Sequence, residues 1–297
     1  MIMISIVICL ALELFIPHMG QFRSLGWINI YSSYVKKVFG RHEVWSGPWG
    51  VIAVLLLPLI LLRVLQAGFS QVWLGLFELM FSIAVLVYCL RYQPQDEWVD
   101  ELVDAVEEDD EERVNTLSEK IVAGPVKKDQ DRLCQVSDAI LGNINEQIFA
   151  VLLWFAFLGP MGALMYRISW YLSEQVDEEW CTPGFKSAAN RLYAILNWLP
   201  ARLLVTGYAI VGSFEDVMLA WRESYQDAPE DMQEVNRLIV VSAGRGAIHF
   251  DRFMHLDDDG NESCTVEAVT AARGLILRTM LAWGIVIAII TLAGWAS

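Results

Sequence analysis

The sequence predicts an all-α, polytopic integral membrane protein with about five to six membrane helices and helical loops outside the bilayer. Three observations lead to this class. Of the 297 residues, 55% are hydrophobic, yet the formal net charge is −15. The charged residues are separated from the apolar ones in blocks along the chain. Several apolar blocks reach about 19 residues, which is the length that crosses a ~30 Å hydrocarbon core at ~1.5 Å per residue.

Four apolar blocks are the clearest predicted spans, and each carries at most one charge. They are residues 49–66 with Arg63, 72–90 with Glu78, and the uncharged stretches 148–166 and 279–297. Unpaired backbone groups cost several kcal/mol each in lipid, so these spans are expected to be helices.

Two further segments are less regular. Met1 to Pro17 lacks a basic leader and contains Glu13, so we interpret it as a retained helix rather than a cleaved signal peptide. Residues 192–212 contain Pro200 and Arg202. This segment is either a polar crossing or a helix lying at the membrane interface, and the sequence leaves both open.

The order of these blocks predicts five regions. Residues 1–91 hold the N-terminal membrane helices, including a hairpin at 49–90, and residues 147–213 form a membrane core. Residues 92–146 are an acidic helical loop, 214–272 a second helical loop, and 273–297 the C-terminal membrane helix. Basic residues flank the open ends of the hairpin, so the positive-inside rule places both loops in the cytoplasm.

Two charge features suggest roles. From Asp96 to Glu112 there are eleven acidic residues and no basic one, which indicates a solvated face or a site for a basic partner or divalent ions. Apolar residues recur there at helical spacing from Val99 to Val106, so this part is expected to be an amphipathic helix. Arg63 and Glu78 should reach similar depth in the hairpin, as a structural ion pair or as part of a proton or substrate path.

Several functional classes find no support. The five cysteines are scattered without a C-x-x-C pair, which argues against a zinc ribbon or a disulfide framework, and we expect no structural metal. A basic nucleic-acid face is absent from the sequence pattern. The chain has no Walker loop, H-E-x-x-H or G-x-S-x-G motif, and the acidic tip 257–263 reads as a turn. These patterns assign no catalytic residue.

Two motifs stand out. The first is L-G-P-M-G-A-L-M-Y-R at 158–167, and the second is A-N-R-L-Y-A-I-L-N-W-L-P-A-R-L at 189–203, followed by Tyr208-Ala209 and G-S-F-E-D at 212–216. Gly159-Pro160 and Gly162 are expected to break or kink a membrane helix and to allow close backbone approach. Pro200 suits the first turn of a helix, and Arg202 can hold a carboxylate, a phosphate or lipid headgroups.

Together these motifs resemble the AmpE-type inner-membrane proteins, which are related to the CobD/CbiB membrane enzymes. The resemblance implies a multi-pass protein of the bacterial inner (plasma) membrane that acts in signalling, linked to β-lactamase induction, cell-wall sensing and the antibiotic response. The implied partners are the lipid bilayer and a cytoplasmic protein, a nucleotide or a cell-wall-derived ligand; a homo-oligomer is compatible with this, and no nucleic acid is expected. The ligand-binding candidates, expected to line one cleft, are Asn143, Glu146, Arg167, Asn190, Arg191, Asn197, Arg202 and Glu215.

The enzyme branch of the resemblance offers an alternative. Those enzymes join cobyric acid to an aminopropanol unit using ATP, which would imply ATP and Mg²⁺ as cofactors here. Where the enzymes have an acidic pair this chain has Tyr193-Ala194, and Trp170 and Ser173 replace an Asn and an Asp, although Asn143 and Glu146 still match. Because hard cations need carboxylates, the sequence favours a regulatory protein over an enzyme. A transporter-like protein using Arg63 and Glu78 is the third hypothesis.

Overall fold

The computed structural model describes residues 5–9, 26–39, 47–69, 76–90, 95–126, 131–175, 181–226, 228–256 and 262–292. The chain divides into two compact units that exchange segments along the sequence. Unit 1 comprises residues 1–92, 147–199 and 288–297, and unit 2 comprises residues 93–146 and 200–287. Each unit is described here by itself.

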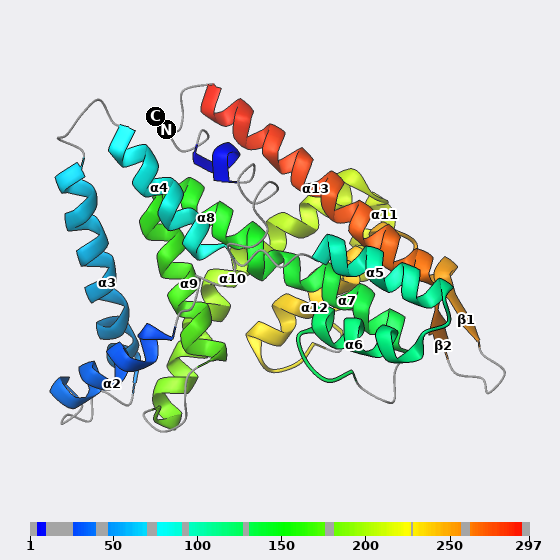
Figure 1. Cartoon of the computed structure of the whole chain (residues 1–297), viewed down its shortest axis with the longest axis horizontal. Helices are drawn as coiled ribbons and strands as arrows, with labels where there is room; N and C mark the ends of the chain where they lie inside the picture. Colours follow the sequence, from blue (N-terminus) through cyan, green and yellow to red (C-terminus); the bar gives the residue numbers. More distant parts are fainter. Residues whose placement is uncertain are drawn as a thin grey trace. The chain divides into compact units, whose positions relative to one another are not determined.

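Unit 1 is built from apolar helices (Figure 1). They are α2 (Trp27–Phe39), α3 (Pro48–Phe69), α4 (Leu76–Cys89), α8 (Ala150–Leu158), α9 (Pro160–Glu174) and the first part of α10 (Pro183–Val211). Helix α9 packs against α8, α3 and α4 and is the centre of this unit. Of the predicted N-terminal helix at 1–17, residues 5–9 are helical and the others lie outside the described residues.

The predicted single span at 148–166 is wrong in one respect, because a turn at Gly159 divides it into two helices. Helix α8 ends at Leu158, Gly159 takes a positive φ of 65°, and Pro160 is the first residue of α9. A Cβ atom on Gly162 would lie 2.1 Å from the carbonyl oxygen of Trp154, so only glycine lets α9 pass this close to α8. The expected helix break and close backbone approach are therefore confirmed, and they divide the predicted span into two helices.

Unit 2 contains the charged helices and a short hairpin (Figure 1). Its helices are α5 (Gln95–Glu107), α6 (Glu111–Val122), α7 (Arg132–Ile144), the second part of α10, α11 (Phe214–Glu223), α12 (Met232–Ala247), the 3₁₀ turn Phe250–Phe253 and most of α13 (Val266–Leu292). A π-helical turn, Asn145–Phe149, continues α7 into α8. Strands β1 (Met254–Leu256) and β2 (Glu262–Cys264) pair antiparallel, with Met254 opposite Cys264.

The amphipathic reading of the acidic segment is confirmed. Val99 and Leu102 are each 1% exposed on α5, while the acidic side chains share the opposite face. Within the unit, Arg245 of α12 forms a bidentate ion pair with Asp138 of α7, at 2.6 and 2.7 Å. The buried Tyr208 hydroxyl of α10 donates to the carbonyl oxygen of Leu141, at 3.0 Å. These contacts hold α10 and α12 against α7.

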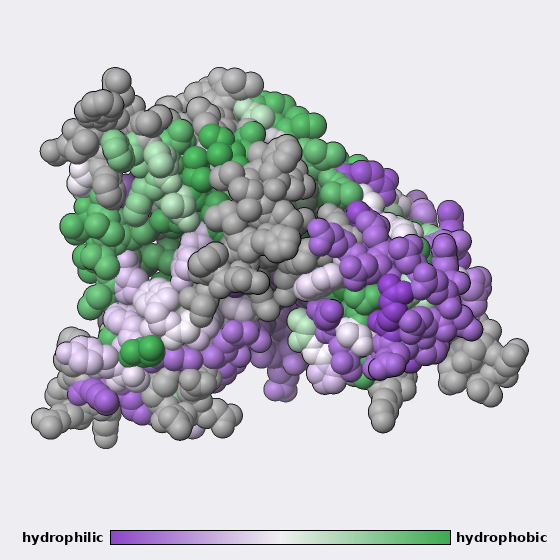
Figure 2. Space-filling model, in the orientation of Figure 1, coloured by the Kyte–Doolittle hydropathy of each residue, from purple (hydrophilic) through white to green (hydrophobic). Residues whose placement is uncertain are grey.

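Four helices are long and apolar enough to cross a membrane among the described residues: Pro48–Gly68, Arg132–Leu158, Pro183–Val211 and Val266–Ile290. A fifth apolar helix, Phe77–Cys89, is shorter. Apolar side chains cover the visible surface of α3 and of the upper part of α13, and hydrophilic ones cover α5 and α6 (Figure 2). The chain is thus an all-α polytopic membrane protein. The segment 192–212 belongs to one of the long candidate spans.

Three expectations about side chains and local structure need correction. Glu78 accepts a hydrogen bond from Gln66 at 3.4 Å, whereas Arg63 is exposed, and within the described residues no ion pair joins Arg63 to Glu78. Pro200 lies inside α10 rather than in its first turn. Cys134 and Cys264 form a disulfide across 130 residues, a pairing that their scattered spacing did not reveal.

Candidate functional site

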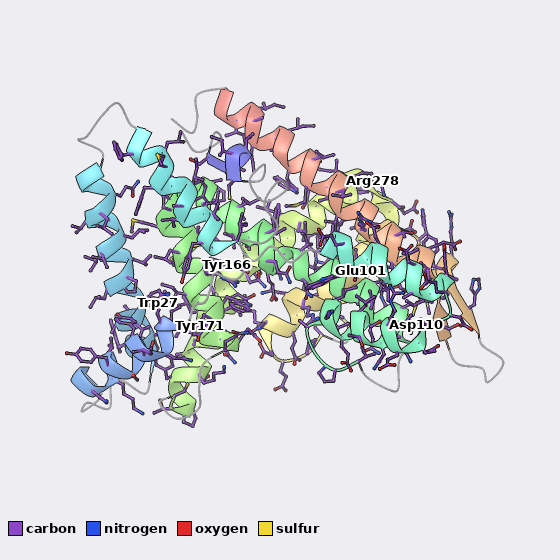
Figure 3. The ribbon with its side chains drawn as sticks, in the orientation of Figure 1. Trp27, Glu101, Asp110, Tyr166, Tyr171 and Arg278 are labelled. Carbon is purple, nitrogen blue, oxygen red and sulfur yellow. A yellow bond between two sulfur atoms is a disulfide. The ribbon has the colours of Figure 1, made fainter. Side chains whose placement is uncertain are left out.

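The two motifs meet inside unit 1 through buried polar side chains. The Tyr166 hydroxyl of α9 donates to the Asn197 Oδ1 of α10 at 3.2 Å and lies 3.4 Å from the Tyr193 hydroxyl. The two tyrosine rings are 5.7 Å apart, and all three side chains are buried. Figure 3 shows Tyr166 on α9, the helix that also carries Tyr171. We call Tyr166, Tyr193 and Asn197 the inner network.

A proline creates a second link between the motifs. Pro200 has no backbone N–H, so the carbonyl oxygen of Leu196, four residues earlier, loses its helical donor. The Trp154 Nε1 of α8 donates to this oxygen at 3.1 Å. The Leu196 carbonyl oxygen in the second motif thus accepts its hydrogen bond from Trp154 of α8 instead of from its own helix.

A more accessible polar rim continues along α9 and α10. The Ser173 hydroxyl donates to Asn190 Oδ1 at 3.2 Å, and Lys186 Nζ donates to the Ser173 carbonyl oxygen. Ser173 is buried, Lys186 and Asn190 are half-buried, and Arg191, the residue after Asn190 in the sequence, is exposed. We call Ser173, Lys186, Asn190 and Arg191 the outer rim. Two cations and a carboxamide in this arrangement can bind carboxylate and amide groups.

The buried Arg167 belongs to the same pair of helices. Its guanidinium carbon lies 4.1 Å from the centre of the Trp170 ring, and its side chain is 6% exposed. This stacking is a cation–π contact, which is stronger in a desolvated environment.

The positions at which the resemblance implies acidic and amide side chains in the enzyme branch are filled differently here. Tyr193 and Ala194 are buried at 0% and 2% exposure, Trp170 stacks on Arg167, and Ser173 bonds to Asn190. None of these four positions offers a carboxylate, so in the described part of unit 1 they do not fit a Mg²⁺–phosphate site. We derive no metal-dependent step from them.

The remaining candidates lie in unit 2 and make separate contacts. Arg202 donates to the buried Asn236 at 2.5 Å and to the Tyr225 hydroxyl at 3.2 Å. Asn143 donates to the Ile121 carbonyl oxygen at 3.5 Å. Glu146 is half-buried in the π-helical turn, and Glu215 is exposed in the first turn of α11.

The predicted site residues thus divide between the two units. Arg167, Asn190, Arg191 and Asn197 lie on α9 and α10 of unit 1, and the other four lie in unit 2. Their convergence on one cleft stays a prediction. Sequence reasoning missed Tyr166 and Tyr193, although both stand inside the motifs, because a tyrosine among apolar residues reads as core packing. It also missed Lys186, which lies before the second motif.

Comparisons with known proteins agree with the motif reading at the level of the family. Residues 6–251 match the model of the family described as CobD/Cbib protein. The chain is similar to proteins named "Cobalamin biosynthesis protein CobD" from Stutzerimonas stutzeri, at 31% identity over 122 residues, and Chromobacterium violaceum, at 28% over 226 residues. It is also similar to the "Probable cobalamin biosynthesis protein CobD" of Methanothermobacter thermautotrophicus, at 25% over 243 residues.

The three alignments cover 38%, 70% and 78% of this chain. They cover 36%, 66% and 76% of the respective relatives, so the chain spans less than two thirds of the length of the first two. No solved structure matches the chain.

These relatives overturn the predicted main function. All three bear cobalamin-biosynthesis names, and none points to signalling, β-lactamase induction or cell-wall sensing. The AmpE-type regulatory role is therefore wrong. The prediction failed because it weighted the missing carboxylates above the shared motifs, and the enzyme branch that it kept as an alternative has the better support.

Proposed function

The chain belongs to the CobD/Cbib protein family, and from this premise we propose that it acts in cobalamin biosynthesis, as a multi-pass protein of the bacterial inner membrane. The observation that carries the proposal is the meeting of the two motifs, both inside the matched region 6–251, in the inner network of unit 1. Because the two family motifs contact each other across two helices, we infer that together they form a functional site.

The outer rim gives this part its chemistry. Lys186 and Arg191 supply positive charge, and Asn190 and Ser173 supply a carboxamide and a hydroxyl. The resemblance implies a substrate with a free carboxyl group, cobyric acid, and charge-assisted hydrogen bonds from Lys and Arg are the strong way to hold a carboxylate. We assign the rim to corrinoid binding and the inner network to holding α9 and α10 in register beneath it.

Amide formation between a corrinoid carboxyl group and an amino alcohol is the reaction that the resemblance implies. Because the unit 1 positions do not fit a Mg²⁺ site, corrinoid binding at the rim is expected not to require ATP or Mg²⁺. This expectation separates substrate binding from any nucleotide chemistry elsewhere in the chain.

Thermal stabilisation of the purified full-length protein in detergent tests the proposal. Cobyric acid should raise the melting temperature in proportion to the logarithm of its concentration, with or without ATP and Mg²⁺. The Arg191→Gln variant should bind it at least about tenfold more weakly, because a hydrogen bond to a charged group contributes about 1.5–3 kcal/mol.

The matched control is Arg222→Gln, which removes the same charge from an exposed position on α11 of unit 2. It should bind cobyric acid like the unaltered protein. No stabilisation by cobyric acid at any concentration, or equal loss in both variants, would contradict the assignment of the rim.

A further inference from the structure

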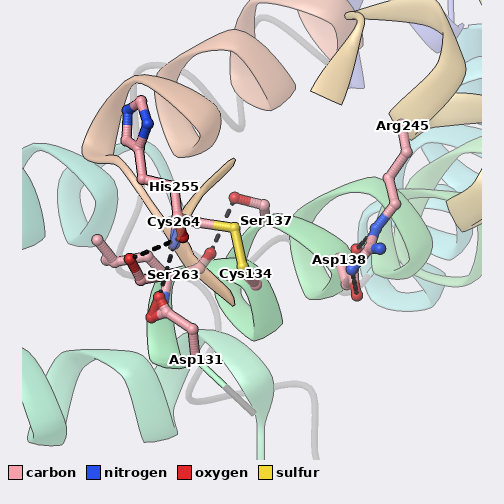
Figure 4. Close-up of a disulfide and its surroundings, with 9 residues drawn as sticks. Asp131, Cys134, Ser137, Asp138, Arg245, His255, Ser263 and Cys264 are labelled. Atoms are coloured by element: carbon pink, nitrogen blue, oxygen red, sulfur yellow. Dashed lines mark hydrogen bonds and ion pairs between the residues drawn. A yellow bond between two sulfur atoms is a disulfide. The ribbon is translucent and has the colours of Figure 1, made fainter. Parts of the chain in front are cut away.

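The disulfide of unit 2 joins the starts of two long helices. Cys134 is the third residue of α7, and Cys264 ends β2, two residues before α13 (Figure 4). Their Cα atoms are 5.3 Å apart, within the range that an unforced disulfide requires.

The bond is packed as a structural element. Cys264 is 6% exposed and belongs to a buried cluster with Phe250 and Ala268, against which Leu133 and Cys134 also pack. Labile or catalytic cysteines are freely accessible to a partner thiol. Here Cys264 is covered by apolar side chains, and Cys134 is only partly exposed.

The Asp131 carboxylate accepts hydrogen bonds from the backbone at or next to the two cysteines. One oxygen of Asp131 accepts from the Leu133 backbone N–H at 3.2 Å, and the other accepts from the Cys264 backbone N–H at 2.9 Å. The ligand atoms of Asp131 and the two cysteines lie within 4.8 Å of one another, a spacing that a metal could also use. Here the sulfur atoms are bonded to each other and both carboxylate oxygens hold backbone donors, so the arrangement favours a disulfide over a metal centre.

The disulfide places the starts of two candidate membrane helices on the same side of the bilayer. The candidate spans Arg132–Leu158 and Val266–Ile290 both begin within two residues of a bonded cysteine. Because the cysteines are covalently joined, these two helix starts lie at the same face of the bilayer, whichever face that is.

We propose that this face is the oxidising, non-cytoplasmic side of the membrane. Buried structural disulfides persist in oxidising compartments and are rare in a reducing cytoplasm. The proposal reverses the cytoplasmic placement of residues 92–146 and 214–272 predicted from the basic residues. Forming the bond removes two protons and two electrons from the thiols. The electrons pass to the disulfide of an oxidising thiol–disulfide oxidoreductase, which becomes a dithiol.

The test uses the full-length chain in the membrane of bacterial spheroplasts, with Cys9, Cys89 and Cys181 replaced by serine. The outside is treated with a membrane-impermeant reductant and then with a small sulfonated maleimide, and the intact mass is measured after purification. We expect no added label without reductant and two labels after external reduction. The Cys264→Ser version of this protein, which leaves the partly exposed Cys134, should accept one label without reductant.

Three results would overturn the proposal. They are two labels without any reductant, two labels that appear only after the membrane is permeabilised, and two labels that appear only after a chelator is added. If the serine variants do not insert, the unaltered protein is labelled in the same way and digested. Both Cys134 and Cys264 must then carry the sulfonated label after external reduction, and a pair labelled only from the inside refutes the inference.

Discussion

At the scale of the residue, the buried hydroxyl of Tyr166 is the most informative group in the molecule. It donates to Asn197 and lies beside the Tyr193 hydroxyl, in a part of unit 1 where no side chain of the network reaches solvent. A buried acceptor that loses its donor carries the full desolvation penalty, so the network links local chemistry to the packing of α9 on α10.

Replacing Tyr166 with phenylalanine should therefore destabilise the protein by about 1–3 kcal/mol, because the buried hydrogen bond from Tyr166 to Asn197 is lost. The measurement is the thermal unfolding midpoint of the detergent-solubilised protein. Tyr34→Phe is the control, since this tyrosine is 67% exposed on α2 and should tolerate the change. Equal midpoints for the two variants would show that the inner network contributes nothing.

At the scale of the element, the helix hairpin α8–α9 depends on one glycine. A methyl group on Gly162 would meet the Trp154 carbonyl oxygen at 2.1 Å and the Leu158 Cβ at 2.8 Å. Neither the backbone nor a Cβ atom can move away without separating the two helices.

Gly162→Ala should accordingly destabilise unit 1 by about 3 kcal/mol or more, as overpacking does when the neighbours cannot yield. Gly284→Ala is the matched control, because a Cβ there meets nothing within 4 Å and alanine favours the helix. Thermal unfolding of both variants measures the difference. A Gly162→Ala protein as stable as Gly284→Ala would refute the close contact.

The proline inside α10 allows a test by a double-mutant cycle. Trp154→Phe should leave the Leu196 carbonyl oxygen without a donor in the presence of Pro200. In a Pro200→Ala background the new N–H at position 200 can donate to that oxygen. The loss of stability from Trp154→Phe should then be smaller by about 1 kcal/mol or more, as the two stability differences will show. Additive effects would mean that Trp154 does not replace the missing helical donor.

The sequence predicts correctly the helices that have a continuous apolar block or a regular apolar spacing. The apolar block at 49–66 became α3 over Pro48–Phe69, and the apolar spacing from Val99 placed the buried face of α5. The prediction failed where a single glycine or proline changed the structure inside a long apolar segment. Gly159-Pro160 divides an apolar run that hydropathy alone reads as a single span, and Pro200 continues inside a helix because Trp154 supplies the missing donor.

Long-range pairing was also beyond the sequence. Cys134 and Cys264 are 130 residues apart, and only the folding of β2 against α7 brings them together. The same holds for the site: Asn190 and Asn197 were expected to matter, but their partners Ser173 and Tyr166 come from a different helix. Periodicity reports which face of a helix is buried, not what lies opposite it.

At the scale of the whole molecule, the chain combines an apolar unit that carries the contacting motifs with a second unit that carries most of the acidic residues. Long helices run through both units in sequence, including α10, whose first part bears Tyr193 and Asn197 of the inner network and whose second part bears Arg202. We propose that this arrangement acts in cobalamin biosynthesis, and that the rim on α9 and α10 is the part of the chain that binds the substrate.

Complementation tests this central claim most directly. The full-length chain is expressed in a bacterial strain that lacks its own CobD-type protein and grows only if it can convert cobyric acid to cobalamin. The account predicts restored growth with the unaltered protein and with Arg222→Gln, and weaker growth at limiting cobyric acid with Arg191→Gln. Absence of growth, with the protein present in the membrane at the level of a complementing relative, would contradict it.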